Sequence, residues 1–314
     1  MTGSLPIRGV FSASFTAFHA DGAVDYARTA AHARGLIEAG CDGIALLGTT
    51  GEANSLSLAE RKAVLEAVVD SGVDPARLVP GTGVCSVPET IELTRHAHDR
   101  GVRTVLLLPP FYYPSPSEDG LYAHYARVLD GGAAPGLRVM LYHIPQMSGV
   151  PITHGLIERL LVSYPGVVIG VKDSSGDLDH MRGLVATFPG LAIFAGADHL
   201  LGPLLRAGGA GCITATSNLI APWLAALARE IAAGASPEAT RAIEGRIAAA
   251  RNLFQRWPQI AALKAALARR TGIADWAVVR PPWLPIEPRE ADILHAAMAD
   301  VLPDPFDSQK KVPA

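Results

Sequence analysis

The stretch GVVIGVKDSSGDLDHMRGLVATF, residues 166–188, contains one strand and one helix in order. Residues 167–171 form an unbroken run of apolar residues and glycine, which is typical of a strand buried on both faces of a parallel sheet. Residues 176–188 space their apolar side chains at the helical period. We therefore predict a buried strand over residues 167–172, followed by a helix that covers it.

The same strand-then-helix order repeats along the chain. We predict strands over residues 7–15, 43–47, 78–81, 104–108, 138–142, 167–172, 191–195 and 211–215, and helices over residues 25–39, 57–71, 88–100, 117–129, 153–163, 176–188 and 198–207. Eight parallel strands, each followed by a helix, predict an α/β protein with a (β/α)8 TIM barrel. An open doubly wound sheet is the alternative, but the even spacing of the units favours a closed barrel.

The pattern changes after the eighth predicted strand. Residues 222–271 are rich in alanine, arginine and leucine and predict successive helices. The proline-rich residues 279–288 predict an extended segment, and residues 292–302 predict a last helix. We therefore expect the barrel over residues 1–218 and a C-terminal helical extension of the same unit over residues 219–302. Pro258 fits the start of one of these helices. We expect residues 303–314 to be a disordered tail.

Composition excludes several classes of partner. With 27 Lys and Arg against 30 Asp and Glu, the 314-residue chain offers no broad basic surface for nucleic acid. No apolar run reaches the roughly 18 residues of a membrane-spanning helix. Cys41, Cys85 and Cys212 form no CxxC pair, which favours a reducing cytoplasm. The 10 histidines form no HxxxH pair, so we predict no metal site.

The lysines differ in their surroundings. Lys62 lies in a charged helical stretch, Lys264 lies in a C-terminal helix and two more lie in the tail, whereas Lys172 ends a buried strand. An amine held in a desolvated place tends to lose its proton, and a neutral amine can attack a ketone. Lys172 is therefore the candidate nucleophile, and a structural ion pair with Asp173 is the alternative.

The segment LLGTTGEANSLS, residues 46–57, lies between a predicted strand and a predicted helix. Thr49 and Thr50 supply hydroxyls, and the backbone N–H groups beside Gly51 can bind a carboxylate. The segment lacks the GK[ST] sequence of a phosphate-binding Walker loop. It predicts a carboxylate-binding loop, although an ordinary turn also explains these residues.

Tyrosines follow two more predicted strands. Tyr142 lies in VMLYHIPQMSGVP, residues 139–151, where a phenol can transfer protons if its neighbours lower its pKa. Tyr112 and Tyr113 stand between prolines in LLPPFYYPSPSEDGLY, residues 107–122. A buried core tyrosine and a packing pair are the structural alternatives. Because the carboxyl ends of barrel strands meet at one face, we predict that these segments share one site with the strand-end lysine.

Together, the motifs resemble a known family. GTTGE, PPFYYP, YHIP and GVKDSSGD, at residues 48–52, 109–114, 142–145 and 170–177, are similar in sequence and order to those of the dihydrodipicolinate synthase / N-acetylneuraminate lyase family. The resemblance runs from residue 7 to residue 302. It implies a (β/α)8 barrel with C-terminal helices, assembled as a homotetramer (a dimer of dimers), and the chemistry of a class I, pyruvate-dependent aldolase.

The resemblance implies a catalytic role for each matching residue. Lys172 would form a Schiff base with the keto carbon of pyruvate or another 2-oxo acid. Tyr142 would shuttle protons, and Thr49 would belong to the proton relay. The imine then yields an enamine, which adds to an aldehyde or forms when a C–C bond breaks. No cofactor is required.

The resemblance also implies binding roles. Thr50, Gly51 and the backbone of Ile213 would hold the carboxylate of the 2-oxo acid. Tyr112 or Tyr113 would reach into the site of the neighbouring subunit, and the FYYP spacing is like the sialate-lyase branch, which favours Tyr112.

The match fails at the second substrate. Family members that use aspartate semialdehyde carry an arginine where this chain has Met147, and a thioether cannot make the bidentate contact of arginine to a carboxylate. The acidic pair that holds sialate hydroxyls is replaced by Asp198 and His199, which are the candidate contacts here. His143 replaces the usual asparagine after the tyrosine.

The sequence therefore predicts a Schiff-base lyase or aldolase that makes or breaks a C–C bond between a 2-oxo acid and an unassigned aldehyde. Alternatives are a 4-hydroxy-tetrahydrodipicolinate synthase proper and a 2-keto-3-deoxy sugar acid dehydratase or aldolase. A non-catalytic barrel that binds a 2-oxo acid is the alternative from another class.

Overall fold

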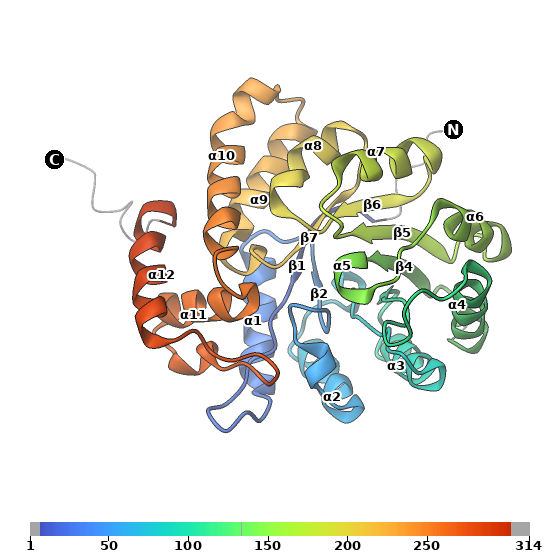
Figure 1. The fold of residues 1–314 in the computed structure, drawn as a ribbon, viewed down its shortest axis with the longest axis horizontal. Coiled ribbons are helices and arrows are strands. Elements are labelled where there is room, and N and C mark those ends of the chain that lie inside the picture. The colour runs from blue at the N-terminus through green and yellow to red at the C-terminus, as the bar shows by residue number, and fades with distance from the viewer. Residues whose placement is uncertain (1–6, 133, 303–314) are drawn as a thin grey trace.

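The computed structural model describes residues 7–132 and 134–302, in which parallel strands form a barrel inside a layer of helices (Figure 1). The strands are β1 (Gly9–Ala13), β2 (Gly43–Ala45), β3 (Thr104–Leu107), β4 (Arg138–His143), β5 (Val168–Asp173), β6 (Ala192–Ala195) and β7 (Gly211–Thr214). Their order around the sheet is β2-β1-β7-β6-β5-β4-β3. The predicted TIM barrel is confirmed.

The third predicted strand, residues 78–81, fills the place between β2 and β3 without forming a regular strand. Leu78 bridges Ile44 of β2, and Gly81 bridges Leu106 of β3. Leu106 N–H donates to the carbonyl of Pro80 at 2.9 Å. Because Pro80 has no N–H of its own, it cannot donate to a neighbouring strand, and the ladder is interrupted there. The segment nearly closes the barrel through isolated contacts.

Helices follow the strands and cover the outside of the barrel (Figure 1). Those before the C-terminal region are α1 (Tyr26–Glu38), α2 (Leu58–Asp70), α3 (Val87–Asp99), α4 (Glu118–Gly132), α5 (Pro145–Ser148), α6 (His154–Ser163), α7 (Leu178–Thr187) and α8 (Leu201–Arg206). Helix α2 begins with a capping box, in which Ser57 Oγ accepts from Glu60 N–H and the Glu60 carboxylate accepts from Ser57 N–H.

The C-terminal region is helical, with α9 (Ser217–Ala232), α10 (Pro237–Phe254), α11 (Gln259–Thr271) and α12 (Pro288–Val301). Helix α9 packs against β1, and the predicted boundary between residues 218 and 219 falls inside it. Helices α10 and α11 contact α9, and both contact α12 (Figure 1). The predicted tail, residues 303–314, lies outside the described residues.

The strands separate two apolar cores. The core inside the barrel contains Met140 and Tyr142 of β4. Val139 and Leu141, which alternate with them, belong to the core between the strands and the helices. This alternation decides which strand-end residues face the barrel interior: Tyr142 does, and its neighbour His143 does not.

Over residues 7–132 and 134–302, every helix is too short or too polar to span a lipid bilayer.

Candidate active site

Lys172 and Tyr142 occupy paired positions near the carboxyl ends of β5 and β4. Paired residues on neighbouring parallel strands point to the same face, so both side chains point into the barrel. Lys172 Nζ lies 4.1 Å from the centre of the Tyr142 ring. Each residue is only 4% exposed. The structure thus brings the predicted amine and phenol together in a desolvated place.

The surroundings of Tyr142 change its acidity. Burial, the largest influence, raises the pKa of Tyr142. The positive charge of Lys172 and hydrogen bonds with the side chains of Thr49, Ser174 and Lys172 act in the opposite direction. The net result is a pKa below the ordinary value, which suits a phenol that must give and take a proton.

Ser174 is a member of this group that the sequence did not single out. It follows β5, and its N–H donates to the carbonyl of His143 at 2.8 Å. A Cβ on Gly196 would lie 2.0 Å from Ser174 Oγ, so only glycine leaves room for the hydroxyl. Its spacing to Lys172 could have predicted this position, because residues two apart in an extended segment share a face.

The predicted carboxylate-binding loop is held in an unusual backbone conformation. Leu47 and Glu52 have φ values of 57° and 53°, in the left-handed region that non-glycine residues rarely adopt. Thr50, between them, is buried. The carbonyl of Gly51 accepts a hydrogen bond from Thr16 Oγ1 at 2.7 Å. Such a conformation persists only where its surroundings hold it.

A cavity of about 20 Å³ lies between this loop and the phenol, bounded by Thr49, Gly83 and Tyr142. Such a space holds about one water molecule. A larger cavity of about 550 Å³ lies at the opposite end of the strands, lined by residues such as Arg138 and Phe188. None of the predicted site residues lines it, so the polar group and not the larger cavity locates the site.

Ile213 lies in β7 and belongs to the same interior core as Tyr142. Its register partner is Phe11 of β1. Its side chain therefore points into the barrel, on the same face of the sheet as Lys172.

The loop after β3 presents two neighbouring aromatic rings to solvent. Tyr112 and Tyr113 are 76% and 73% exposed, and their ring centroids lie 5.3 Å apart in an edge-to-face arrangement. Met147, in α5 directly after β4, is 56% exposed. Paired exposed aromatic side chains are common at protein interfaces.

Asp198 follows β6 and interacts with the C-terminal helices. Asp198 is fully buried after β6, and its Oδ2 lies 3.4 Å from an Arg251 guanidinium nitrogen of α10. Its charge contributes to raising the pKa of Cys212, whose side chain belongs to the outer core, although burial of the thiol is the larger cause. Its neighbour His199 is exposed.

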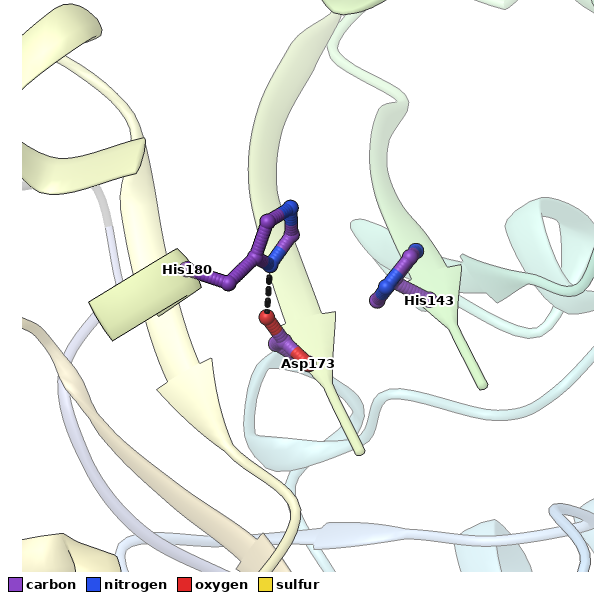
Figure 2. A group of neighbouring side chains, drawn as sticks. All are labelled: His143, Asp173 and His180. Atoms are coloured by element: carbon purple, nitrogen blue, oxygen red, sulfur yellow. Dashed lines mark hydrogen bonds and ion pairs between the residues drawn. The ribbon is translucent and has the colours of Figure 1, made fainter. Parts of the chain in front are cut away.

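The residues that directly follow Tyr142 and Lys172 form a second polar group with His180; its members are His143, Asp173 and His180 (Figure 2). His143 and Asp173 end β4 and β5, and His180 lies in the first turn of α7. The fully buried Asp173 carboxylate accepts from His180 Nδ1 at 2.6 Å and from Ser175 N–H at 2.8 Å. The two imidazole rings stack with their centroids 4.8 Å apart.

Two histidines and a carboxylate within 4.8 Å are also residue types that bind transition metals. The hydrogen bonds favour a different role. Ile152 N–H donates to His143 Nδ1 at 3.0 Å, so the neutral ring carries its proton on Nε2 and keeps no lone pair for a metal. Burial lowers the pKa of His143, which keeps the ring neutral. We interpret this group as a hydrogen-bonded support for the ends of β4 and β5.

Known proteins resemble this chain over nearly its whole length. The model of the dihydrodipicolinate synthetase family matches residues 6–301. An uncharacterized DapA-like lyase of Chloroflexus aurantiacus is 39% identical over 296 residues, which are 94% of this chain and 97% of the relative. The chain belongs to the dihydrodipicolinate synthetase family.

Other members of the dihydrodipicolinate synthetase family agree. A 4-hydroxy-tetrahydrodipicolinate synthase of Kineococcus radiotolerans is 37% identical over 306 residues, 96% of each chain. The crystal structure of YagE, a prophage protein of this family from E. coli K12 in complex with pyruvate, matches with a TM-score of 0.86 at 28% identity. It covers 94% of this chain and 99% of YagE. The resemblance seen in the motifs is confirmed, and the chain is a lyase or aldolase of this family.

Proposed function

We propose that Lys172 forms a Schiff base with pyruvate or another 2-oxo acid, and that the enzyme makes or breaks a C–C bond between this acid and an aldehyde. The observation that carries the proposal is the Lys172 amine 4.1 Å from the centre of the Tyr142 ring, with both side chains buried. The Lys172 amine can attack a ketone once it has passed its proton to a neighbouring base, and the Tyr142 phenol lies beside it. YagE in complex with pyruvate supports this choice of acid.

Each step uses a group on the barrel rim. The Lys172 amine attacks the keto carbon, and the carbinolamine loses water to give a protonated imine. Tyr142, with its lowered pKa, passes protons to and from the reacting atoms through Thr49. The imine draws electrons from the adjacent C–C or C–H bond, and the resulting enamine attacks the aldehyde in the synthetic direction. This chemistry needs no metal or organic cofactor.

The carboxylate of the 2-oxo acid is assigned to the loop at residues 47–52 and to β7. Thr50, the Gly51 backbone and the Ile213 backbone are its proposed partners. Oriented N–H groups and hydroxyls favour an anion without adding a formal charge beside the amine. This arrangement leaves the keto carbon free to meet Lys172.

The active form is proposed to be a cytoplasmic homotetramer, built as a dimer of dimers. Tyr112 or Tyr113 would complete the proton relay of the neighbouring subunit. Their exposure of 76% and 73% in the single chain supports a contact made outside it.

We propose that the aldehyde substrate carries no carboxylate on the part that approaches Met147. The exposed thioether there offers no charge to bind one. This favours a lyase or aldolase with an aldehyde other than aspartate semialdehyde over the activity named for the Kineococcus relative. His199, exposed after β6, remains a proposed contact to the second substrate, as does Asp198.

Borohydride trapping tests the proposal. Incubation with saturating pyruvate and borohydride at neutral pH is expected to give a stable mass adduct on the peptide that contains Lys172. Lys172→Ala should lose the adduct, and Lys62→Ala, which removes a partly exposed lysine of α2, should keep it. A wild-type protein that forms no adduct would contradict the Schiff-base mechanism.

A further inference from the structure

A buried ion pair joins the proposed carboxylate-binding loop to the C-terminal helices. Lys264 of α11 places Nζ 2.6 Å from Glu52 Oε1, and neither side chain has any exposed surface. Nζ also donates to the carbonyl of Thr16 at 3.0 Å. The other carboxylate oxygen accepts from Arg280 N–H at 2.8 Å. The partners are 212 residues apart in sequence, so the contact joins the loop after β2 to the C-terminal extension.

The loop depends on contacts of this kind. Glu52 is itself one of the residues with a left-handed backbone, at a φ of 53°. Thr16 connects the ion pair to the loop a second time, because its carbonyl accepts from Lys264 and its hydroxyl donates to the carbonyl of Gly51. Two paths therefore run from the α11 ammonium into residues 51 and 52.

Stability alone does not explain a buried pair here. Replacing a buried ion pair by apolar side chains of similar volume is often neutral or stabilising, because desolvation of the charges offsets their attraction. Apolar contact is also non-directional, whereas a charged hydrogen bond fixes distance and angle. What the pair adds is a defined geometry for the residue that closes the loop.

We propose that Glu52 and Lys264 are positioning residues, through which α11 sets the conformation of residues 47–52. The consequence for the reaction rests on the proposed function, in which Thr50 and the Gly51 backbone bind the 2-oxo acid carboxylate. The C-terminal extension is then part of the catalytic unit, although it carries no reacting group in this mechanism.

The double variant Glu52→Gln with Lys264→Met tests the proposal. It leaves no unpaired buried charge, and it keeps an acceptor for Arg280 N–H, so it is expected to fold. The pyruvate KM is expected to rise about tenfold or more, with a smaller change in kcat, because the loop acts on binding. Amide exchange of residues 47–53 should accelerate in hydrogen-exchange mass spectrometry. A folded double variant with the wild-type KM and wild-type exchange would overturn the proposal.

A control removes an ion pair that joins the barrel helix α8 to the extension. Arg206 of α8 and Glu244 of α10 lie 2.7 Å apart and do not touch the loop at residues 47–52. The double variant Arg206→Met with Glu244→Gln should keep the wild-type pyruvate KM. An equal rise in KM for both double variants would overturn the assignment, because it would reflect general loosening of the C-terminal helices.

If the Glu52 and Lys264 double variant does not fold, the variant Glu52→Asp tests the positioning role instead. It keeps the charge but is too short to reach Lys264 and Arg280 N–H together. A raised KM and faster loop exchange support the positioning role, and wild-type values overturn it. Hydrogen exchange needs no substrate, so it judges the role of α11 even if wild-type protein forms no adduct on Lys172, which would defeat the proposed function alone.

Discussion

Lys172 and Lys264 are both buried amines, with 4% and 0% of their surface exposed, yet their surroundings differ. Lys264 faces a carboxylate at 2.6 Å and a backbone carbonyl at 3.0 Å. Burial lowers the pKa of Lys264, and the charge of Glu52 opposes this shift. Lys172 instead faces the phenol ring of Tyr142. Burial is therefore common to both lysines, and the partner distinguishes an amine that holds the structure from one that can react.

Removing the Lys172 amine is expected to have the largest effect on activity. Lys172→Ala is expected to lose the pyruvate adduct and at least about a thousandfold in kcat/KM, because no other group can form the imine. Steady-state kinetics and mass spectrometry measure both effects. A variant with wild-type turnover would show that the other lysine, or none, carries the reaction.

The phenol gives the next effect. Tyr142→Phe should lower kcat by about a hundredfold or more, which is the usual contribution of a general acid and base. An ultraviolet titration of wild-type protein minus this variant should show a tyrosine that ionises below the ordinary pKa of about 10.

The same titration in Lys172→Met should move in the other direction. Without the lysine charge, burial acts with less opposition, so the pKa of Tyr142 should rise and the phenolate should appear only at higher pH. An unchanged titration curve would mean that the amine and the phenol are not coupled.

For the free energy of unfolding, we expect the larger loss from replacing Lys264 and the smaller loss from replacing Lys172. Lys264→Met leaves the Glu52 carboxylate buried and unpaired, which should cost about 3–5 kcal/mol in urea denaturation. Lys172→Met leaves a neutral phenol behind and should change stability by only about 1 kcal/mol. Equal losses for both variants would break the distinction between structural and reactive lysines.

The smallest expected effect concerns the second substrate. Met147→Arg should improve kcat/KM by about tenfold for aldehydes that carry a carboxylate, which is the value of one charged hydrogen-bonded contact. Activity towards aldehydes without a carboxylate should stay near the wild-type level. A gain for both classes of aldehyde would mean that residue 147 acts through the conformation of α5 and not through the charge of the substrate.

Local sequence patterns were enough to predict most of the barrel. Buried parallel strands are continuous apolar runs, and the motifs at their carboxyl ends predict that Lys172, Tyr142 and Thr49 share one face of the barrel. The segment at residues 78–81 shows the limit of this approach. Its apolar character predicts its place in the barrel, but the missing N–H of Pro80 prevents a regular ladder.

Long-range contacts could not be predicted in the same way. Glu52 and Lys264 each lie in segments without a local signal for pairing, and the chain separates them by 212 residues. Asp198 stands in a family motif near the substrate, but a partner from α10, 53 residues later, holds its carboxylate. Such partners depend on how the helices pack, which periodicity alone does not specify.

The alternation at the ends of β4 and β5 restricts where this chain can change length. Tyr142 and Lys172 face the barrel, and His143 and Asp173 face the helices. Deleting one residue of β5 before Lys172 would place the Asp173 carboxylate where the amine now stands, and inserting one there would turn Lys172 towards the supporting histidines. Changes in length outside β4 and β5 leave this alternation intact.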